Sequence, residues 1–314
     1  MSAMIKTVGL TKRFGAKVAV DAIDLQVGKG EVFGFLGPNG AGKTTTVRML
    51  TCLIGPTAGQ AWLGDWQVGR DDEHIRRNVG ILTEAPGLYE RFSARFNLEF
   101  HAKLHGLPGG HRAAQVEKYL RMLDLWDRRD EAVGTFSKGM KQRMAIARAV
   151  VHEPRVLFLD EPTSGLDPEA AHTVRDFISD LRAAGRTIFL CTHNLDEANR
   201  LCDRIAILSQ RIVATGSPAE LRQRLYGRRT VLQMVEPHAE ALAAIRRLPF
   251  AATAEAEGDK IVVPVSEPAT QNPALVREAV QAGAQVLYVT ELEPSLEDVY
   301  LSLVGNTRRA EVKA

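Results

Sequence analysis

The first two thirds of the chain alternate short apolar runs with helical patterns. Apolar runs at residues 5–10, 19–27 and 32–36 are typical of strands, and a loop followed by a helix is expected over residues 42–53. Apolar side chains at helical spacing over residues 112–126 place a helix within a helical insertion at about residues 87–151. Strands are expected again at residues 156–159 and 187–191, on either side of a helix near residues 170–184. This alternation predicts buried parallel strands and an α/β fold.

Beyond about residue 226 the pattern changes. A strand at 231–235, a helix at 239–248, a hairpin of 251–256 with 261–265, a helix at 274–281 and a strand at 285–290 give the order βαββαβ. This is the order of a small α+β, ferredoxin-like domain. An amphipathic helix at 296–303 and a charged tail follow. The predicted organisation is therefore a first domain over residues 1–225, a C-terminal accessory domain over 226–306 and a tail over 307–314.

Composition narrows the classes of partner and compartment. The 314 residues include 40 basic and 38 acidic side chains, and a net charge of +2 favours neither a nucleic acid nor an anionic membrane surface as a partner. The three scattered cysteines form neither a disulfide framework nor a CxxC metal site, so a reducing cytoplasm is the expected compartment. The longest run without a charge, residues 49–64, is interrupted by glycine and proline, so no segment is expected to span a membrane or to direct secretion.

Residues 37–44 read GPNGAGKT and match the pattern G-x-x-x-x-G-K-[ST] between a predicted strand and a predicted helix. Glycines at 37, 40 and 42 allow backbone N–H groups to surround a phosphate, Lys43 adds a positive charge, and Thr44 can place its hydroxyl on Mg²⁺. An ordinary glycine turn would leave the run Lys-Thr-Thr-Thr at the helix start unexplained. The sequence therefore predicts a phosphate-binding loop.

Two carboxylates follow a buried strand in the stretch RVLFLDEPTSGLD, residues 155–167. Asp160 and Glu161 stand at the carboxyl end of that strand, where ligands bind in open α/β sheets. One carboxylate can hold Mg²⁺, and its neighbour can orient or deprotonate an attacking water. Adjacent acids that merely end a strand are common, but their place after a phosphate-binding loop favours the catalytic interpretation.

His193 follows another apolar strand, in FLCTHNLDEA. A single histidine at a strand end is more often structural than catalytic. In a protein with a phosphate-binding loop it could hydrogen-bond the γ-phosphate and position the attacking water.

The stretch FSKGMKQR, residues 136–143, begins a predicted helix that contains no acidic residue from Ser137 to residue 151. Helix N-termini favour acidic side chains because free N–H groups and the helix dipole place partial positive charge there. Here Lys138 and Lys141 stand instead. The pattern Ser-x-Gly before a helix is by itself only an N-cap signal, but the absent acids leave the helix end ready to bind an anion.

These motifs, in this order, resemble the nucleotide-binding domain of ATP-binding cassette (ABC) transporters over roughly residues 4–225. The resemblance implies a P-loop NTPase fold of the ABC ATPase type, with an antiparallel β subdomain and a helical insertion. FSKGM resembles the ABC signature, usually Leu-Ser-Gly-Gly-Gln, which in that family binds the γ-phosphate of ATP held by the opposing subunit. The resemblance thus implies that two protomers, arranged head to tail, bind ATP and Mg²⁺ between them.

The resemblance also assigns the site residues. Phe14 matches the aromatic residue that stacks on adenine, usually a tyrosine, and Glu84 stands where the family usually has a glutamine that contacts Mg²⁺ and the transmembrane partner. The implied nucleotide-binding set is Phe14, Gly37, Pro38, Asn39, Gly40, Ala41, Gly42, Lys43, Thr44 and Thr45. The signature that acts on the other subunit's nucleotide consists of Ser137, Lys138, Gly139 and Met140, and the D-loop residues are Ser164 and Asp167. The metal-binding residues are Thr44, Glu84 and Asp160. The catalytic residues are Glu161 and His193.

In three features the chain resembles the ATP-binding subunits of ABC-2 type exporters, including drug-resistance and sodium-efflux systems. They are SKGMKQR in place of the commoner signature, Glu84, and a C-terminal domain that ends in EPSLEDVYLSLVG. The resemblance implies an ATP-hydrolysing motor subunit on the cytoplasmic face of the membrane, a homodimer with a separate permease and no nucleic-acid partner. The patch at residues 88–92 either faces that permease or packs within the helical insertion.

Two other readings remain open at this stage. A soluble ABC ATPase of translation or DNA repair would use the same site without transport, but such relatives usually carry two cassettes or a long coiled coil. This chain has one phosphate-binding loop and no sustained heptad pattern. A signalling GTPase or nucleotide kinase would leave FSKGM and His193 unexplained.

Overall fold

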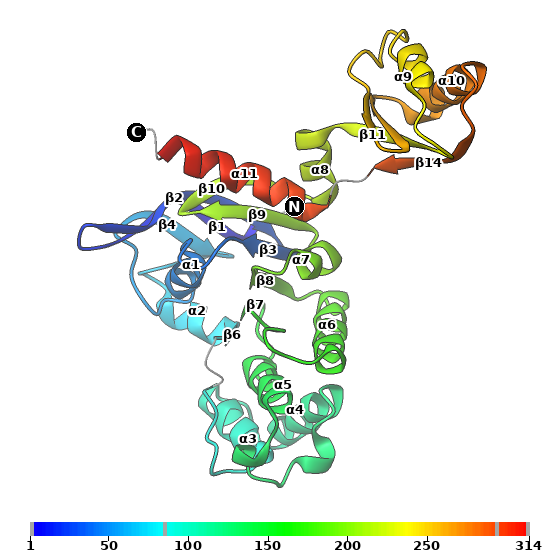
Figure 1. The fold of residues 1–314 in the computed structure, drawn as a ribbon. Helices are drawn as coiled ribbons and strands as arrows, with labels where there is room; N and C mark the ends of the chain where they lie inside the picture. Colours follow the sequence, from blue (N-terminus) through cyan, green and yellow to red (C-terminus); the bar gives the residue numbers. More distant parts are fainter. Residues whose placement is uncertain (1–2, 84–86, 293–294, 312–314) are drawn as a thin grey trace. The chain divides into compact units, whose positions relative to one another are not determined.

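The computed structural model describes residues 3–83, 87–292 and 295–311. The chain divides into two compact units, Met1–Ser217 and Pro218–Ala314, and each is described by itself (Figure 1). This division falls a few residues before the boundary expected at 225/226.

A six-stranded sheet forms the centre of the first unit, in the order β10-β9-β3-β8-β7-β6. Its strands are β3 (Val32–Leu36), β6 (Val79–Leu82), β7 (Val156–Asp160), β8 (Thr187–Thr192), β9 (Arg204–Ser209) and β10 (Arg211–Gly216). Every pairing is parallel except that of β10 with β9. All residues of β3, β7 and β8 are buried, as continuous apolar runs predict. Because these three neighbours are parallel, the residues that follow them meet at one edge of the sheet.

An antiparallel sheet of order β2-β1-β4-β5 completes this part of the unit. It consists of β1 (Ala3–Phe14), β2 (Lys17–Gly28), β4 (Ala58–Leu63) and β5 (Trp66–Gln67). Helices α1 (Lys43–Leu50) and α2 (Asp72–Asn78) belong to the same region. One buried cluster joins side chains of both sheets and α1, among them Ile5, Phe35 and Leu50. This confirms the predicted antiparallel β subdomain.

Helices form the remainder of the first unit. They are α3 (Ala94–Leu104), α4 (Gly109–Met122), α5 (Lys138–Val150), α6 (Pro168–Ala183) and α7 (Leu195–Leu201), with two short 3-10 turns at Trp126–Arg128 and Val133–Thr135. Helices α3, α4 and α5 pack on one another (Figure 1). The helical insertion expected at about 87–151 is therefore present.

The second unit contains α8 (Pro218–Tyr226), β11 (Arg228–Met234), α9 (Ala239–Ile245), β12 (Glu255–Glu257), β13 (Lys260–Val265), α10 (Pro268–Gln281), β14 (Val286–Leu292) and α11 (Leu296–Glu311). Its sheet has the order β12-β13-β11-β14 with antiparallel neighbours, as the predicted βαββαβ arrangement requires. The hairpin predicted with residues 261–265 is present, since β12 pairs antiparallel with β13, but the strand predicted at 251–256 begins only at Glu255. Buried Ala251 and Ala254 lie in turns that pack on the core, and β12 covers only three residues.

Three histidines lie together beside the helical insertion. The rings of His105 and His152 stack with centroids 3.6 Å apart, and a His152 ring nitrogen lies 3.0 Å from the carbonyl oxygen of Val79. Burial, with the charge of Arg148, lowers the pKa of His101 to about 4, and burial beside His105 lowers that of His152 to about 4. Burial also lowers the pKa of His105. The folded cluster therefore resists protonation that the unfolded chain accepts.

This cluster predicts a loss of stability in mild acid. Between pH 6.5 and about 4 the unfolded chain binds more protons than the folded one. The histidines' contribution to the free energy of unfolding is therefore complete above pH 6.5 and is lost as the pH falls toward 4. His152 alone accounts for a loss on the order of 3 kcal/mol. Urea unfolding of His152→Gln, which keeps a donor for Val79, should depend less steeply on pH than that of wild type. The exposed His111→Gln is the matched control, and equal slopes for all three proteins would contradict the prediction.

Candidate functional site

The phosphate-binding loop joins the buried strand β3 to α1. Gly40 and Gly42 have φ angles of 82° and 102°, in the region that favours glycine. A Cβ atom at Gly42 would lie 2.5 Å from the carbonyl oxygen of Ala19, so the loop passes too close to β2 for a larger residue. No side chain caps α1 at Gly42, and its first turn has no acid. The helix therefore begins with N–H groups available to an anion.

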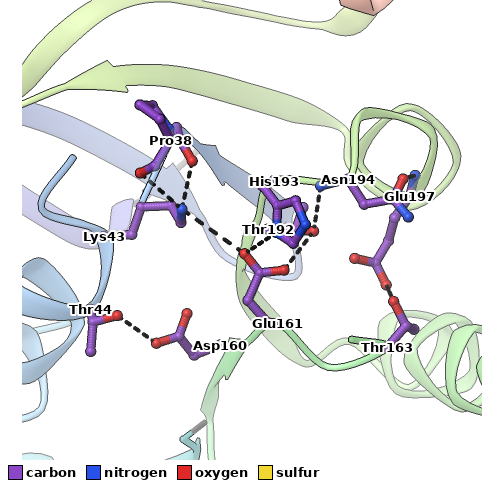
Figure 2. A network of polar contacts seen from close by, with 11 residues as sticks. Pro38, Lys43, Thr44, Asp160, Glu161, Thr163, Thr192, His193, Asn194 and Glu197 are labelled. Carbon is purple, nitrogen blue, oxygen red and sulfur yellow. Dashed lines mark hydrogen bonds and ion pairs between the residues drawn. The ribbon is translucent and has the colours of Figure 1, made fainter. Parts of the chain in front are cut away.

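Lys43 extends back over this loop rather than away from it. Its Nζ donates to the carbonyl oxygens of Gly37 at 2.6 Å and Pro38 at 3.4 Å, and it lies 4.0 Å from Glu161 Oε1 (Figure 2). The side chain is only 7% exposed, so its charge is held at a fixed place beside the loop. A fixed ammonium group next to free N–H groups suits a polyphosphate.

Thr44 and Asp160 bring two hard oxygen ligands together. Thr44 Oγ1 donates to Asp160 Oδ2 at 2.8 Å, which joins the first turn of α1 to the end of β7 (Figure 2). Hydroxyl and carboxylate oxygens in this arrangement fit Mg²⁺, which takes few protein ligands and completes its shell with water and phosphate. Glu84, the third predicted metal-binding residue, lies outside the described residues.

The backbone turns sharply at Glu161. Its φ angle of 51° is unusual for a residue other than glycine, and its N–H donates to the carbonyl oxygen of Cys191 at 2.9 Å. The carboxylate is held from two sides, because Oε1 lies 2.8 Å from His193 Nδ1 and Oε2 accepts from Thr192 Oγ1 at 3.3 Å (Figure 2). An ionised carboxylate only accepts hydrogen bonds, so Nδ1 of His193 carries the proton in this contact.

The signature residues form the start of α5. Ser137 is the N-cap, and its Oγ accepts from the N–H of Met140 at 3.2 Å. Lys138 Nζ lies close to the space that a Cβ at Gly165 would fill, and Gln142 Nε2 donates to the carbonyl oxygen of Pro162 at 2.9 Å. The signature helix therefore contacts the D-loop of its own chain.

One open cleft of roughly 1120 Å³ gathers most of these groups. The predicted site residues that line it are Phe14, Pro38, Asn39, Gly40, Gly42, Lys43, Thr44, Thr45, Lys138, Asp160, Glu161, Ser164 and His193. Others do not line it: Gly37, Ala41, Ser137, Gly139, Met140 and Asp167. Asp167 instead caps α6 by accepting from the N–H of Ala170 at 2.8 Å.

Several lining residues were not predicted. They are Lys17, Ala19, Glu90, Phe136, Lys141 and Gln142. Lys141 was noted for its charge, which here pairs with Glu90 at 2.8 Å. The contacts of Thr163 and Thr192 with the acids of this region were also missed, although both threonines lie inside motifs that the sequence singled out.

Comparison with known proteins decides the family. Residues 20–164 match the profile of the ABC transporter family, and residues 216–304 match that of the DrrA1-3-like ATP-binding protein C-terminal domain. The chain is 36% identical to the daunorubicin resistance ATP-binding protein DrrA3 of Streptomyces coeruleorubidus, over 98% of this chain and 97% of that protein. It is also 36% identical to the bacitracin transport ATP-binding protein BcrA of Bacillus licheniformis, over 97% and 98%. The chain belongs to the ABC transporter family of ATP-binding proteins.

Solved structures agree with this membership. An ATP-binding subunit of an ABC transporter superposes with a TM-score of 0.67 at 31% identity, over 71% of this chain and 94% of that one. An ATP-binding cassette solved as a dimer with ADP and Pi gives a TM-score of 0.63 at 25% identity, over 68% and 98%. The predicted ABC ATPase fold and the resemblance to subunits of drug-resistance exporters are confirmed. Among the described helices of this ABC ATPase, none has the length and apolar character needed to cross a bilayer.

Proposed function

We propose that this chain is the ATP-hydrolysing motor subunit of a membrane exporter. It binds ATP and Mg²⁺ between two protomers arranged head to tail, and ATP-driven closure of that pair moves a separate permease at the cytoplasmic face of the membrane. The observation that carries the proposal is the placement of Glu161, whose carboxylate is held by His193 and Thr192 within 4.0 Å of the Lys43 ammonium group. The names of the relatives, which include resistance, transport and export proteins, support the exporter role.

The chain's own groups divide the chemistry between binding and proton transfer. The loop N–H groups and Lys43 bind the phosphates, and Phe14, whose ring is 53% exposed at the cleft, stacks on the base. Thr44 and Asp160 would hold Mg²⁺, which when bound neutralises charge that develops on the phosphates. Glu161 accepts a proton from the attacking water on its carboxylate, and His193 fixes the direction of that carboxylate.

An exposed aromatic surface in the helical insertion, formed around the start of α3, supports a contact with a permease. Tyr89, Phe92 and Phe96 are 46%, 48% and 42% exposed, and the rings of Phe92 and Phe96 stack with centroids 4.4 Å apart. Exposed aromatic side chains gathered in one place are typical of protein contact surfaces. The sequence left open whether residues 88–92 pack within the insertion, and the exposure of Tyr89 and Phe92 favours a contact surface.

Substitution of Lys43 tests the binding half of this proposal. We expect Lys43→Ala to weaken ATP binding at least about tenfold, because a buried charge on the phosphates is lost in both the ground state and the transition state. Titration of the purified chain with ATP and Mg²⁺ measures the affinity. The exposed Lys29→Ala removes an equal charge from a residue that does not line the cleft and should bind ATP as wild type does. Equal affinity of Lys43→Ala and wild type would refute the assignment of the loop.

A further inference from the structure

A buried acid lies behind the proposed catalytic carboxylate. Glu197, in the first turn of α7, is only 3% exposed. Its Oε1 accepts from Thr163 Oγ1 at 2.8 Å, and its Oε2 is buried without a hydrogen-bond partner among the described residues. Burial raises the pKa of Glu197, an effect that the hydrogen bond from Thr163 partly opposes. Burial of a carboxyl group with an unpaired oxygen destabilises the folded state, and an apolar side chain would avoid this penalty.

The partner of Glu197 belongs to the D-loop. Thr163 begins the stretch TSGLD, two residues after Glu161, and the intervening turn is closed by the N–H of Ser164, which donates to the carbonyl oxygen of Glu161 at 3.2 Å. The Thr163 hydroxyl leaves this turn in the direction of α7, where it meets Glu197 (Figure 2). The side-chain contact therefore ties the D-loop to the helix that follows His193.

A series of hydrogen bonds connects the same helix to the catalytic carboxylate. The N–H of Glu197 donates to Asn194 Oδ1 at 3.1 Å, and the N–H of Asn194 donates to Thr192 Oγ1 at 3.0 Å. That hydroxyl in turn donates to Glu161 Oε2. Glu161 and Thr163 are thus both fixed to the first turn of α7, one through its carboxylate and the other through its hydroxyl.

We propose that Glu197 is a positioning residue for ATP hydrolysis. Through its contact with Thr163 it holds the D-loop, residues 163–167, in a fixed position relative to Glu161 and His193. This inference rests on the proposed function, because it takes Glu161 as the base. Glu197 does not line the cleft. It acts by keeping the D-loop turn, and so the backbone that carries Glu161, in one arrangement. Loss of the Thr163 contact frees that turn and misplaces the carboxylate relative to the attacking water.

The test measures kcat and KM for ATP in the full chain with Thr163→Val, Thr163→Ser and Glu197→Leu. Thr163→Val keeps the shape of the side chain and removes the donor, and we expect it to lower kcat about tenfold with KM changed less than about twofold. Thr163→Ser keeps the hydroxyl and should restore most of the rate. A matched control is Thr173→Val, which removes an exposed hydroxyl that donates to the carbonyl oxygen of Glu169 on α6.

Glu197→Leu, which removes the acceptor for Thr163, gives a second readout that does not depend on Thr163→Val folding well, and we expect it to lower kcat as Thr163→Val does. If both residues act through one contact, the double variant Thr163→Val/Glu197→Leu loses no more activity than Thr163→Val alone. A merely structural role predicts a lower melting temperature for each variant, with kcat per folded molecule unchanged. That outcome would overturn the inference. A wild-type protein that hydrolyses no ATP would instead remove the proposed function itself, so the two failures are distinct.

Discussion

Glu161→Gln should lower the rate of ATP hydrolysis at least about 100-fold while ATP binding remains close to that of wild type. The amide keeps the shape of the side chain and can still accept a hydrogen bond from His193, but it cannot take a proton from water. Binding is preserved because Lys43 and the loop N–H groups are unchanged. The rate is measured as phosphate release and the affinity by titration with ATP.

The same variant should accumulate in the ATP-bound, associated state. If hydrolysis releases the pair, as the proposed function requires, size-exclusion chromatography with ATP and Mg²⁺ should show more dimer for Glu161→Gln than for wild type. Glu73→Gln, at an exposed acid of α2, removes an equal charge and should behave as wild type. Hydrolysis by Glu161→Gln at the wild-type rate would remove Glu161 from the role of base.

Ser137→Arg should abolish hydrolysis while the affinity of a single subunit for ATP stays nearly unchanged. Ser137 is exposed at the start of α5 and does not line the cleft of its own chain, so its loss leaves that chain's phosphate-binding loop intact. If the signature serves the nucleotide of a second subunit, a bulky cation at this end fills the space of the γ-phosphate. We expect at least about a 100-fold loss of activity, because the site is then incomplete.

A purely structural role for Ser137 makes a different prediction. Ser137 caps α5 through the N–H of Met140, and loss of a cap costs about 1 kcal/mol of stability without a selective effect on hydrolysis. Ser93 supplies the matched control, because it caps α3 in the same way by accepting from the N–H of Phe96 at 3.1 Å. Ser93→Arg should lose comparable stability and keep its ATPase activity. Equal activity of the two variants would show that Ser137 is only a cap.

The sequence predicted the strands that carry the site better than those that support it. Strands β3, β7 and β8 are continuous apolar runs, and each is present at the expected place. Strand β4, with the sequence AGQAWL, was not predicted, because it begins with small residues and owes its pairing to β1. Strands β5, β6, β9 and β10 and helices α2, α7 and α8 were also missed. Strands β5, β6 and β10 lie at sheet edges, where long-range pairing decides the structure more than local propensity does.

Within the site, the motifs named the expected residues but did not show how their side chains contact one another. The strand order brings Glu161 to His193 across 32 positions of sequence, and Thr163 to Glu197 across 34. The left-handed backbone at Glu161 carries no local sequence signal, because glutamate, unlike glycine or asparagine, rarely adopts it. Glu197 belongs to no motif that the sequence singled out for chemistry, and only its burial in the first turn of α7 distinguishes it.

Mixing two inactive variants tests the head-to-tail arrangement most directly. A dimer of Ser137→Arg with Lys43→Ala contains one site in which the intact phosphate-binding loop of the first subunit faces the intact signature of the second; its other site has lost both. The account therefore predicts that ATPase activity returns on mixing, to about a quarter of the wild-type rate if subunits pair at random and the sites act independently. Differently tagged subunits show by co-purification, in the presence of ATP and Mg²⁺, that the mixed dimer has formed. Two variants that remain inactive although the mixed dimer is present would contradict the composite site.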